Sequence, residues 1–135
     1  MASNRLWQNR SKKTVILDSN AIMMLFEFNI NLEDELTRLV GNYKIVIPRP
    51  VFNELNYLSE NGKGKKKINA KASLKLIERY EIVDIDEKNA DDAVFSLAKK
   101  SKGFVVTNDK ELRNRLKKFS INVIFLRSKK RLVMS

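Results

Sequence analysis

The sequence predicts an α/β fold in which a parallel sheet of five strands is covered by helices on both faces. Short β-branched and apolar runs alternate with stretches in which apolar residues recur every three or four positions. Gly, Pro and Asn separate these segments. A strict alternation of strands and helices is typical of a parallel sheet. A length of 135 residues suits one domain with a substantial core.

The first half of the chain contains two of the expected strands. Residues 14–18 are rich in β-branched side chains, and two helical stretches at about 20–28 and 32–41 follow, joined by a turn at 29–31. A short strand at 44–47 precedes a helix begun by Pro50, a residue that suits the first helical position. Residues 59–67, which hold two glycines and four lysines, predict a flexible basic loop.

The second half continues the alternation. Helical periodicity to about Tyr80 leads into a strand at 81–85, and the next helix begins near Ala90 and is closed by Gly103. A strand at 104–107, a helix at 109–118 and a last strand at 121–126 follow. We therefore expect a basic N-terminal tail at 1–13, one domain at 14–126, and a basic segment at 127–135 that forms either a tail or a final ribbon.

Composition excludes several functions. The chain has no His and no Cys, so Ser-His-Asp and Cys-His catalysis and Cys/His zinc sites are excluded, as are disulfides. No apolar run approaches the roughly 20 residues that a membrane span needs, and residues 1–13 lack the apolar stretch of a secretory signal. We expect a cytoplasmic protein without a membrane partner.

Acidic residues occur at four stations along the predicted fold. Asp18 closes the first strand, Glu54 lies early in the helix begun by Pro50, Asp91 and Asp92 open a later helix, and Asp109 follows the fourth strand. The carboxyl ends of parallel strands meet at one edge of a sheet, where α/β proteins place their chemistry. Carboxylates gathered there repel one another unless a cation lies between them, so we expect a Mg²⁺ or Mn²⁺ site.

The overall charge indicates a polyanionic partner. The 27 Lys and Arg residues outnumber the 16 Asp and Glu residues and give a formal net charge of +11. A basic protein with an acidic cluster suits a nucleic acid, because Lys and Arg hold the backbone while metal ions act on one phosphate. The alternative is a Lys-rich surface that only reflects the composition of the host's proteins.

Four motifs resemble those of PIN-domain ribonucleases. They read Val-Ile-Leu-Asp-Ser-Asn-Ala-Ile at 15–22, Ile-Pro-Arg-Pro-Val-Phe-Asn-Glu-Leu at 47–55, Asn-Ala-Asp-Asp-Ala-Val-Phe-Ser-Leu-Ala at 89–98 and Gly-Phe-Val-Val-Thr-Asn-Asp-Lys-Glu-Leu at 103–112. Each motif alone is weak, but four in order over nearly the whole chain form a strong signal. The resemblance implies a three-layer α/β/α sandwich, a Mg²⁺ or Mn²⁺ site and cleavage of single-stranded RNA.

The resemblance also implies roles for the acidic residues. Asp18, Glu54, Asp91 and Asp109 match the family's catalytic acids, and Asp92 is a further candidate metal ligand. Asp91 is favoured over Asp92 because it lies 18 residues before Asp109, as in the family pattern. Each Asp could instead cap a helix, and Glu54 could be a solvated first-turn residue.

Further residues are candidates for supporting the acids and holding RNA. Asn20 and Thr107 could orient a carboxylate or a bound water, or could be ordinary capping and strand-end residues. The basic candidates for RNA binding, each of which could also be a solvated surface charge, are Arg49, Lys63, Lys65, Lys66, Lys67, Arg113, Arg115, Lys117 and Lys118.

The expected function is that of a divalent-metal-dependent endoribonuclease that uses a metal-activated water and leaves 5′-phosphate and 3′-hydroxyl ends. The alternative is a PIN-like RNA-binding or ribosome-assembly protein with little or no catalysis. A phosphoacceptor receiver domain fits poorly, because its acidic pair should follow the first strand, where Ser19 and Asn20 stand. The chain resembles VapC-like toxins in size and ribosomal-RNA processing nucleases in Asp91-Asp92. Single-stranded or structured RNA, an antitoxin or ribosome-assembly partner and a homodimer are the expected partners.

Overall fold

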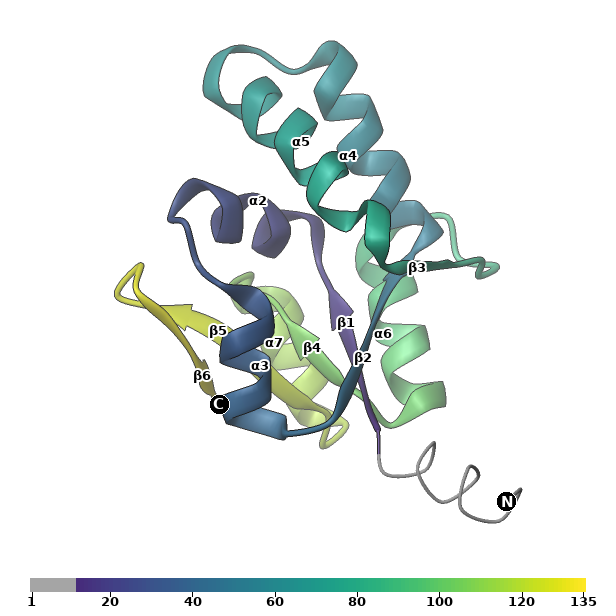
Figure 1. The fold of residues 1–135 in the computed structure, drawn as a ribbon. Helices are drawn as coiled ribbons and strands as arrows, with labels where there is room; N and C mark the ends of the chain where they lie inside the picture. The colour runs from purple at the N-terminus through teal and green to yellow at the C-terminus, as the bar shows by residue number, and fades with distance from the viewer. Residues whose placement is uncertain (1–11) are drawn as a thin grey trace, which may run out of the picture.

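The protein is a three-layer α/β/α sandwich, seen in a computed structural model that describes residues 12–135 (Figure 1). The α/β class with a mostly parallel central sheet is confirmed. The strands are β1 (Lys13–Leu17), β2 (Tyr43–Pro48), β3 (Glu81–Val83), β4 (Phe104–Val106), β5 (Asn122–Arg127) and β6 (Arg131–Met134). The helices are α2 (Ser19–Glu27), α3 (Leu32–Val40), α4 (Arg49–Asn61), α5 (Gly64–Leu76), α6 (Ala90–Ser101) and α7 (Lys110–Lys118), with a 3₁₀ turn η1 (Ile77–Arg79).

The sheet has the strand order β3-β2-β1-β4-β5-β6, with β1 at its centre. β1 pairs in parallel with β2 on one side and with β4 on the other, so Leu17 lies opposite Val106. The chain therefore leaves β1 toward one side of the sheet and later returns on the other. In α/β folds this reversal opens a crevice outside the carboxyl ends of the two diverging strands.

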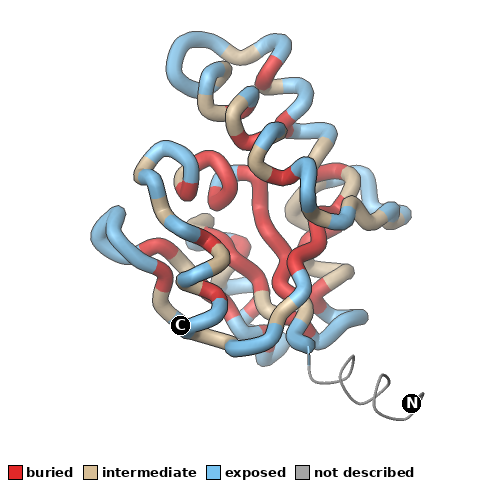
Figure 2. The backbone as a smooth tube through the Cα atoms, in the orientation of Figure 1, coloured by how far each residue is buried: buried red, intermediate tan, exposed pale blue. Residues whose placement is uncertain are grey.

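Helices cover both faces of the sheet and one of its ends (Figure 1). α6 packs on β1, β2 and β4, and α7 packs on β5. α3 packs on β2 and β6 from the opposite face of the sheet. The central strands are buried between these layers, as Figure 2 shows. α4 and α5 form a hairpin that rises above the carboxyl edge of the sheet, with α2 packed against it.

The expectation of five strands is wrong, because a sixth strand completes the sheet. β6 pairs antiparallel with β5, so the basic segment at 127–135 is the ribbon and not the tail. Ser128 and Lys129 form the tight turn with φ values of 56° and 57°. The outer backbone groups of Leu132 are also paired, since its N–H donates to Glu35 at 2.7 Å and its carbonyl accepts from Arg38 at 2.7 Å.

The expected flexible loop at 59–67 is also wrong. α4 continues to Asn61 and α5 begins at Gly64, which leaves two connecting residues. Gly64 adopts a φ of 58°, and a Cβ at Gly62 would lie 2.4 Å from the Leu58 carbonyl oxygen, so the glycines make a tight helical corner and not a flexible segment. Lysine is a good helix former, which lets the basic run continue as helix.

The expected basic N-terminal tail at 1–13 lies almost entirely outside the residues that the structure describes. Residues 1–11 of the expected basic tail lie outside the described part of the chain, and Lys13 already belongs to β1. Within residues 12–135 the structure contains no helix that is long and apolar enough to span a membrane.

Candidate active site

Asp18 lies at the carboxyl end of the central strand, where the sheet reverses direction. It occupies the N-cap position of α2, but its side chain makes no capping hydrogen bond. It instead accepts a hydrogen bond of 2.9 Å from the Thr107 hydroxyl, which follows β4. Both residues are buried, with Asp18 4% exposed and Thr107 fully buried. The two strands that diverge at this point therefore share one buried polar contact.

The environment of Asp18 disfavours its charged form. The pKa of Asp18 is raised to about 6, with burial as the largest cause and the charges of Asp91 and Glu54 acting in the same direction. The hydrogen bond from Thr107 acts in the opposite direction. A bound cation would favour the charged form of this carboxylate and so offset the cost of its burial.

Glu54 reaches the same region from α4. The hydroxyl of Ser19, which is itself buried, donates a hydrogen bond to Glu54 Oε1. α4 starts at the carboxyl end of β2, so this bond links the ends of β1 and β2. Ser19 contacts a candidate acid although the sequence pattern did not single it out as a site residue. Its position directly after Asp18 was the available signal.

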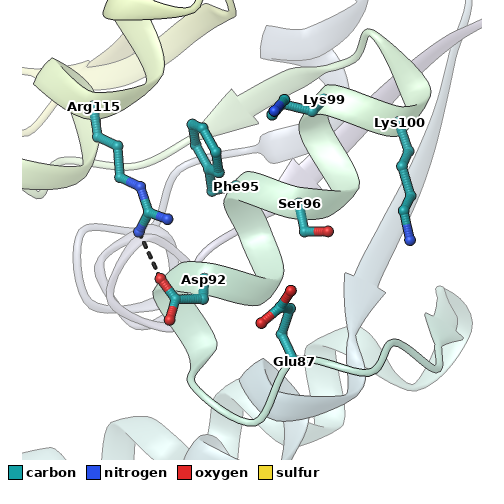
Figure 3. Close-up of a pocket in the computed structure, with 7 residues that line it drawn as sticks. All are labelled: Glu87, Asp92, Phe95, Ser96, Lys99, Lys100 and Arg115. Carbon is teal, nitrogen blue, oxygen red and sulfur yellow. Dashed lines mark hydrogen bonds and ion pairs between the residues drawn. The ribbon is translucent and has the colours of Figure 1, made fainter.

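Asp91 and Asp92 point in different directions from the start of α6. Burial raises the pKa of Asp91, and the charges of Asp109, Glu54 and Asp92 add to this, so Asp91 belongs to the acidic group. Asp92 instead forms an ion pair of 2.6 Å with Arg115 of α7 (Figure 3). Asn89 caps the helix by accepting a bond from the Asp92 N–H at 3.1 Å. This arrangement favours Asp91 as the inner acid.

Asp109 lies close to the other acids and also caps the start of α7. Its Oδ1 accepts a 3.1 Å bond from the Leu112 N–H and thereby caps α7. Its own N–H donates to Thr107 Oγ1 at 3.1 Å. The side-chain amide of Asn108 exchanges two bonds with the Leu126 backbone, at 2.7 Å and 3.0 Å. Asn108 thus stands in for a strand peptide beyond β4 and fixes the loop that carries Asp109.

The basic candidates for RNA binding are spread over several elements. Arg49 pairs with Asp84 at 2.9 Å. Lys63, Lys65 and Lys66 are exposed around the start of α5, and Lys67 is partly buried. Lys117 and Lys118 lie in the last turn of α7, about 12 Å along the helix from Asp109.

Two further candidates make contacts other than those expected. The Arg113 guanidinium lies 4.2 Å from the Phe125 ring centroid. Asn20 is exposed and lines a cavity between α2 and α5 together with Lys65 and Lys66. Within residues 12–135, no side-chain hydrogen bond joins Asn20 to an acid.

The donor set at this edge fits a hard divalent cation. Its acids supply only oxygen ligands, which Mg²⁺ and Mn²⁺ prefer, and burial together with the charges of neighbouring acids raises the pKa of both Asp18 and Asp91. In the described part of the chain, however, no three of these side chains are arranged to hold an ion as they stand. Several of their oxygens are engaged with Thr107, Ser19, the start of α7 and Arg115, so ligation requires side-chain rotation.

Comparisons with known proteins agree with the resemblance noted in the sequence. Residues 15–129 match the family described as "PIN like domain". Ribonuclease VapC4 of Methanocaldococcus jannaschii is 35% identical over 120 residues, which cover 86% of this chain and 92% of the relative. Ribonuclease VapC9 of Archaeoglobus fulgidus is 31% identical over 124 residues, 92% of this chain and 90% of the relative. The solved PIN domain endonuclease Utp24 superposes with a TM-score of 0.76 at 25% identity over 90% of both chains.

Proposed function

The chain belongs to the PIN-like domain family, and we propose that it is a divalent-metal-dependent endoribonuclease that cleaves single-stranded RNA. Relatives that align with most of its length are named ribonucleases, which supports nuclease activity. The observation that carries the proposal is Asp18, a buried carboxylate at the reversal point of the sheet. Its pKa is raised by burial and by the charges of two further acids.

Each acidic residue has a distinct role in this proposal. Asp18, Glu54, Asp91 and Asp109 would hold the cation, and Asp92 would position Arg115 beside them. Thr107 orients Asp18, and Ser19 orients Glu54. When bound, a divalent cation lowers the pKa of a water molecule and stabilises charge on the phosphate. The chain has no His, so a carboxylate is the nearby group that can accept the proton of the attacking water.

The reaction is hydrolysis of a phosphodiester bond. Water oxygen bonds to phosphorus, the bond between phosphorus and the 3′-oxygen breaks, and that oxygen takes up a proton. The products carry 5′-phosphate and 3′-hydroxyl ends. The exposed lysines at the start of α5 would hold neighbouring phosphates, because a net charge of +11 favours a polyanion.

We propose that RNA is the partner in the cytoplasm, and that the chain acts either as a toxin held by an antitoxin or in ribosomal-RNA processing. The names of the VapC relatives favour the first setting, and the resemblance of Asp91-Asp92 to ribosomal-RNA processing nucleases favours the second. A homodimer is a further proposal. Mapping the cleaved RNA ends after induced expression separates the settings, because a processing enzyme cuts at few sites in precursor ribosomal RNA.

A cleavage assay tests the activity. A 5′-labelled single-stranded RNA should be cut in Mg²⁺ or Mn²⁺, remain intact in EDTA and give fragments whose 3′ ends accept ligation directly. Asp18→Asn protein is the negative control for contaminating nucleases. Binding of RNA without cleavage in either metal would support the alternative of a PIN-like RNA-binding protein.

A further inference from the structure

The groove between α6 and α7 brings two aromatic rings together at the surface. Phe95 of α6 and Phe119, directly after α7, have ring centroids 4.9 Å apart with planes at 80°. Phe119 is 54% exposed although it is large and apolar. Phe95 also contacts the core, so its ring is held in place while the Phe119 ring faces solvent.

Cations flank both rings. The Lys99 ammonium lies 5.5 Å from the Phe95 centroid and 5.0 Å from the Phe119 centroid. The Arg115 guanidinium lies 4.2 Å from the Phe95 centroid, and Figure 3 shows Phe95 between Arg115 and Lys99. An aromatic face beside a cation can hold a planar ring and an adjacent negative charge at the same time.

Two hollows share this wall. A cavity of about 450 Å³ is lined by Glu87, Asp92, Phe95, Ser96, Lys99, Lys100 and Arg115 (Figure 3). A second cavity of about 430 Å³ lies on the other side of Lys99 and includes Lys102 and Phe119. Lys99 lines both hollows, and each hollow adds one ring, Phe95 in the first and Phe119 in the second.

The groove begins at the acidic site. Asp92 forms the ion pair with Arg115 at 2.6 Å, and the preceding residue, Asp91, is one of the clustered acids. Asp92, Phe95 and Lys99 follow one another along the same helix, and about 10 Å of helix axis separates the first from the last. A strand that ran along α6 from the acids would pass the two rings.

We propose that this groove is a stacking subsite for a base of the single-stranded RNA that flanks the cleaved bond, an inference that rests on the proposed ribonuclease function. A base would stack on the exposed Phe119 ring, which Phe95 supports edge-to-face, while Lys99 contacts its phosphate. Sequence-tolerant binding of single strands uses this combination of aromatic faces and cations. Bases of a duplex are already stacked on one another, so the subsite selects unpaired RNA.

Binding of a short single-stranded RNA that carries one 2-aminopurine, measured in EDTA over a range of NaCl concentrations, tests the proposal. Phe119→Leu should weaken binding by on the order of 10-fold and reduce the quenching of 2-aminopurine, because the ring on which the base stacks is removed. Its salt dependence should not change. Lys99→Ala should lower the slope of log K against log salt by about 0.7, the value for one phosphate on a single strand.

Matched variants separate a local effect from a general one. Phe26→Leu removes another ring that is 45% exposed, and Lys75→Ala removes another exposed lysine; neither should alter binding. Thermal melts check that every variant is folded. In Mg²⁺, Phe119→Leu should raise KM and leave kcat at saturating RNA unchanged, since the ring does not touch the acids.

The outcomes distinguish this inference from the proposed function. If the wild-type protein cleaves RNA but the Phe119 and Lys99 variants bind and quench like wild type, the subsite is refuted and the nuclease stands. If wild type binds with quenching that depends on Phe119 but never cleaves, the nuclease is refuted and the subsite stands. If wild type does not bind single-stranded RNA, both are refuted.

Discussion

Asp18→Asn should stabilise the metal-free protein while abolishing its activity. The Asp18 carboxyl has a pKa of about 6 in the folded chain against 3.8 for an ordinary Asp. Because one pKa unit corresponds to about 1.36 kcal/mol, the charge costs the folded state about 3 kcal/mol at pH 7.5. Asn carries no charge and can still accept the bond from Thr107. Its buried NH₂ group costs about 1 kcal/mol, which leaves a gain of about 2 kcal/mol.

The sign of the pH dependence follows from the direction of the shift. Since the folded-state pKa lies above the unfolded one, the folded state binds more protons between pH 3.8 and about 6. The wild-type protein therefore loses this stability as pH rises through that window. Below pH 3.8 the carboxyl is protonated in both states, so the advantage of Asp18→Asn should vanish there.

Urea unfolding in EDTA at pH 7.5 and at pH 3.5 measures the effect. In a thermal melt, each kcal/mol of added stability should raise Tm by about 4 °C. Asp86→Asn, which changes an exposed carboxylate on the loop before α6, is the control and should alter neither midpoint. Added Mg²⁺ should stabilise the wild type and not Asp18→Asn, because only a protein that binds the ion gains. A gain of equal size at both pH values, or a loss at pH 7.5, would refute the account of a buried, repelled carboxylate.

Three other perturbations follow from the site. Asp91→Asn should reduce the cleavage rate at saturating Mn²⁺ by on the order of 10²-fold or more, whereas Asp92→Asn should cost less because Asp92 faces Arg115. Thr107→Val should lower the free energy of unfolding by about 1–2 kcal/mol, measured in urea, since Asp18 loses a donor and the Asp109 N–H an acceptor. A basic cluster at the start of α5 consists of Lys63, Lys65, Lys66 and Lys67. Replacing all four with alanine should lower the slope of log K for RNA binding against log salt by about 0.7 for each phosphate that the cluster binds.

Each of these has an outcome that contradicts it. A larger loss in Asp92→Asn than in Asp91→Asn would mean that the register of the inner acid is wrong by one residue. A Thr107→Val protein as stable as wild type would show that the buried bonds are replaced by water. An unchanged slope of log K against log salt in the lysine variant would mean that the start of α5 is a solvated corner that does not bind RNA.

The regular alternation of strands and helices could be predicted because each apolar run carries its own period. The sequence left β6 open between a tail and a ribbon, because its turn is formed by Ser128 and Lys129 within a charged run. Tight turns whose two central residues have positive φ usually contain Asn-Gly or Asp-Gly, which makes them recognisable in a sequence. The sequence hides the helical start of α5 for a related reason, because Gly62 and Gly64 suggest a loop but form one corner between two helices.

Pairings between distant residues limited the prediction of the site. Asp18 and Thr107 could be expected to meet because both end neighbouring strands. The ion pair between Asp92 and Arg115 depends on how α6 and α7 lean on each other, which no local pattern encodes. The bond between Ser19 and Glu54 depends likewise on the path of α4 over the carboxyl edge.

The contacts of α3 with β6 bear on how the molecule avoids unwanted association. An edge strand with free N–H and C=O groups is a template for pairing with another chain. Here the ion-paired Glu35 and Arg38 occupy those groups at Leu132. At the other edge, β3 has three residues. Within residues 12–135, neither margin offers a long row of open hydrogen-bonding groups, which disfavours edge-to-edge pairing with a second copy of the chain.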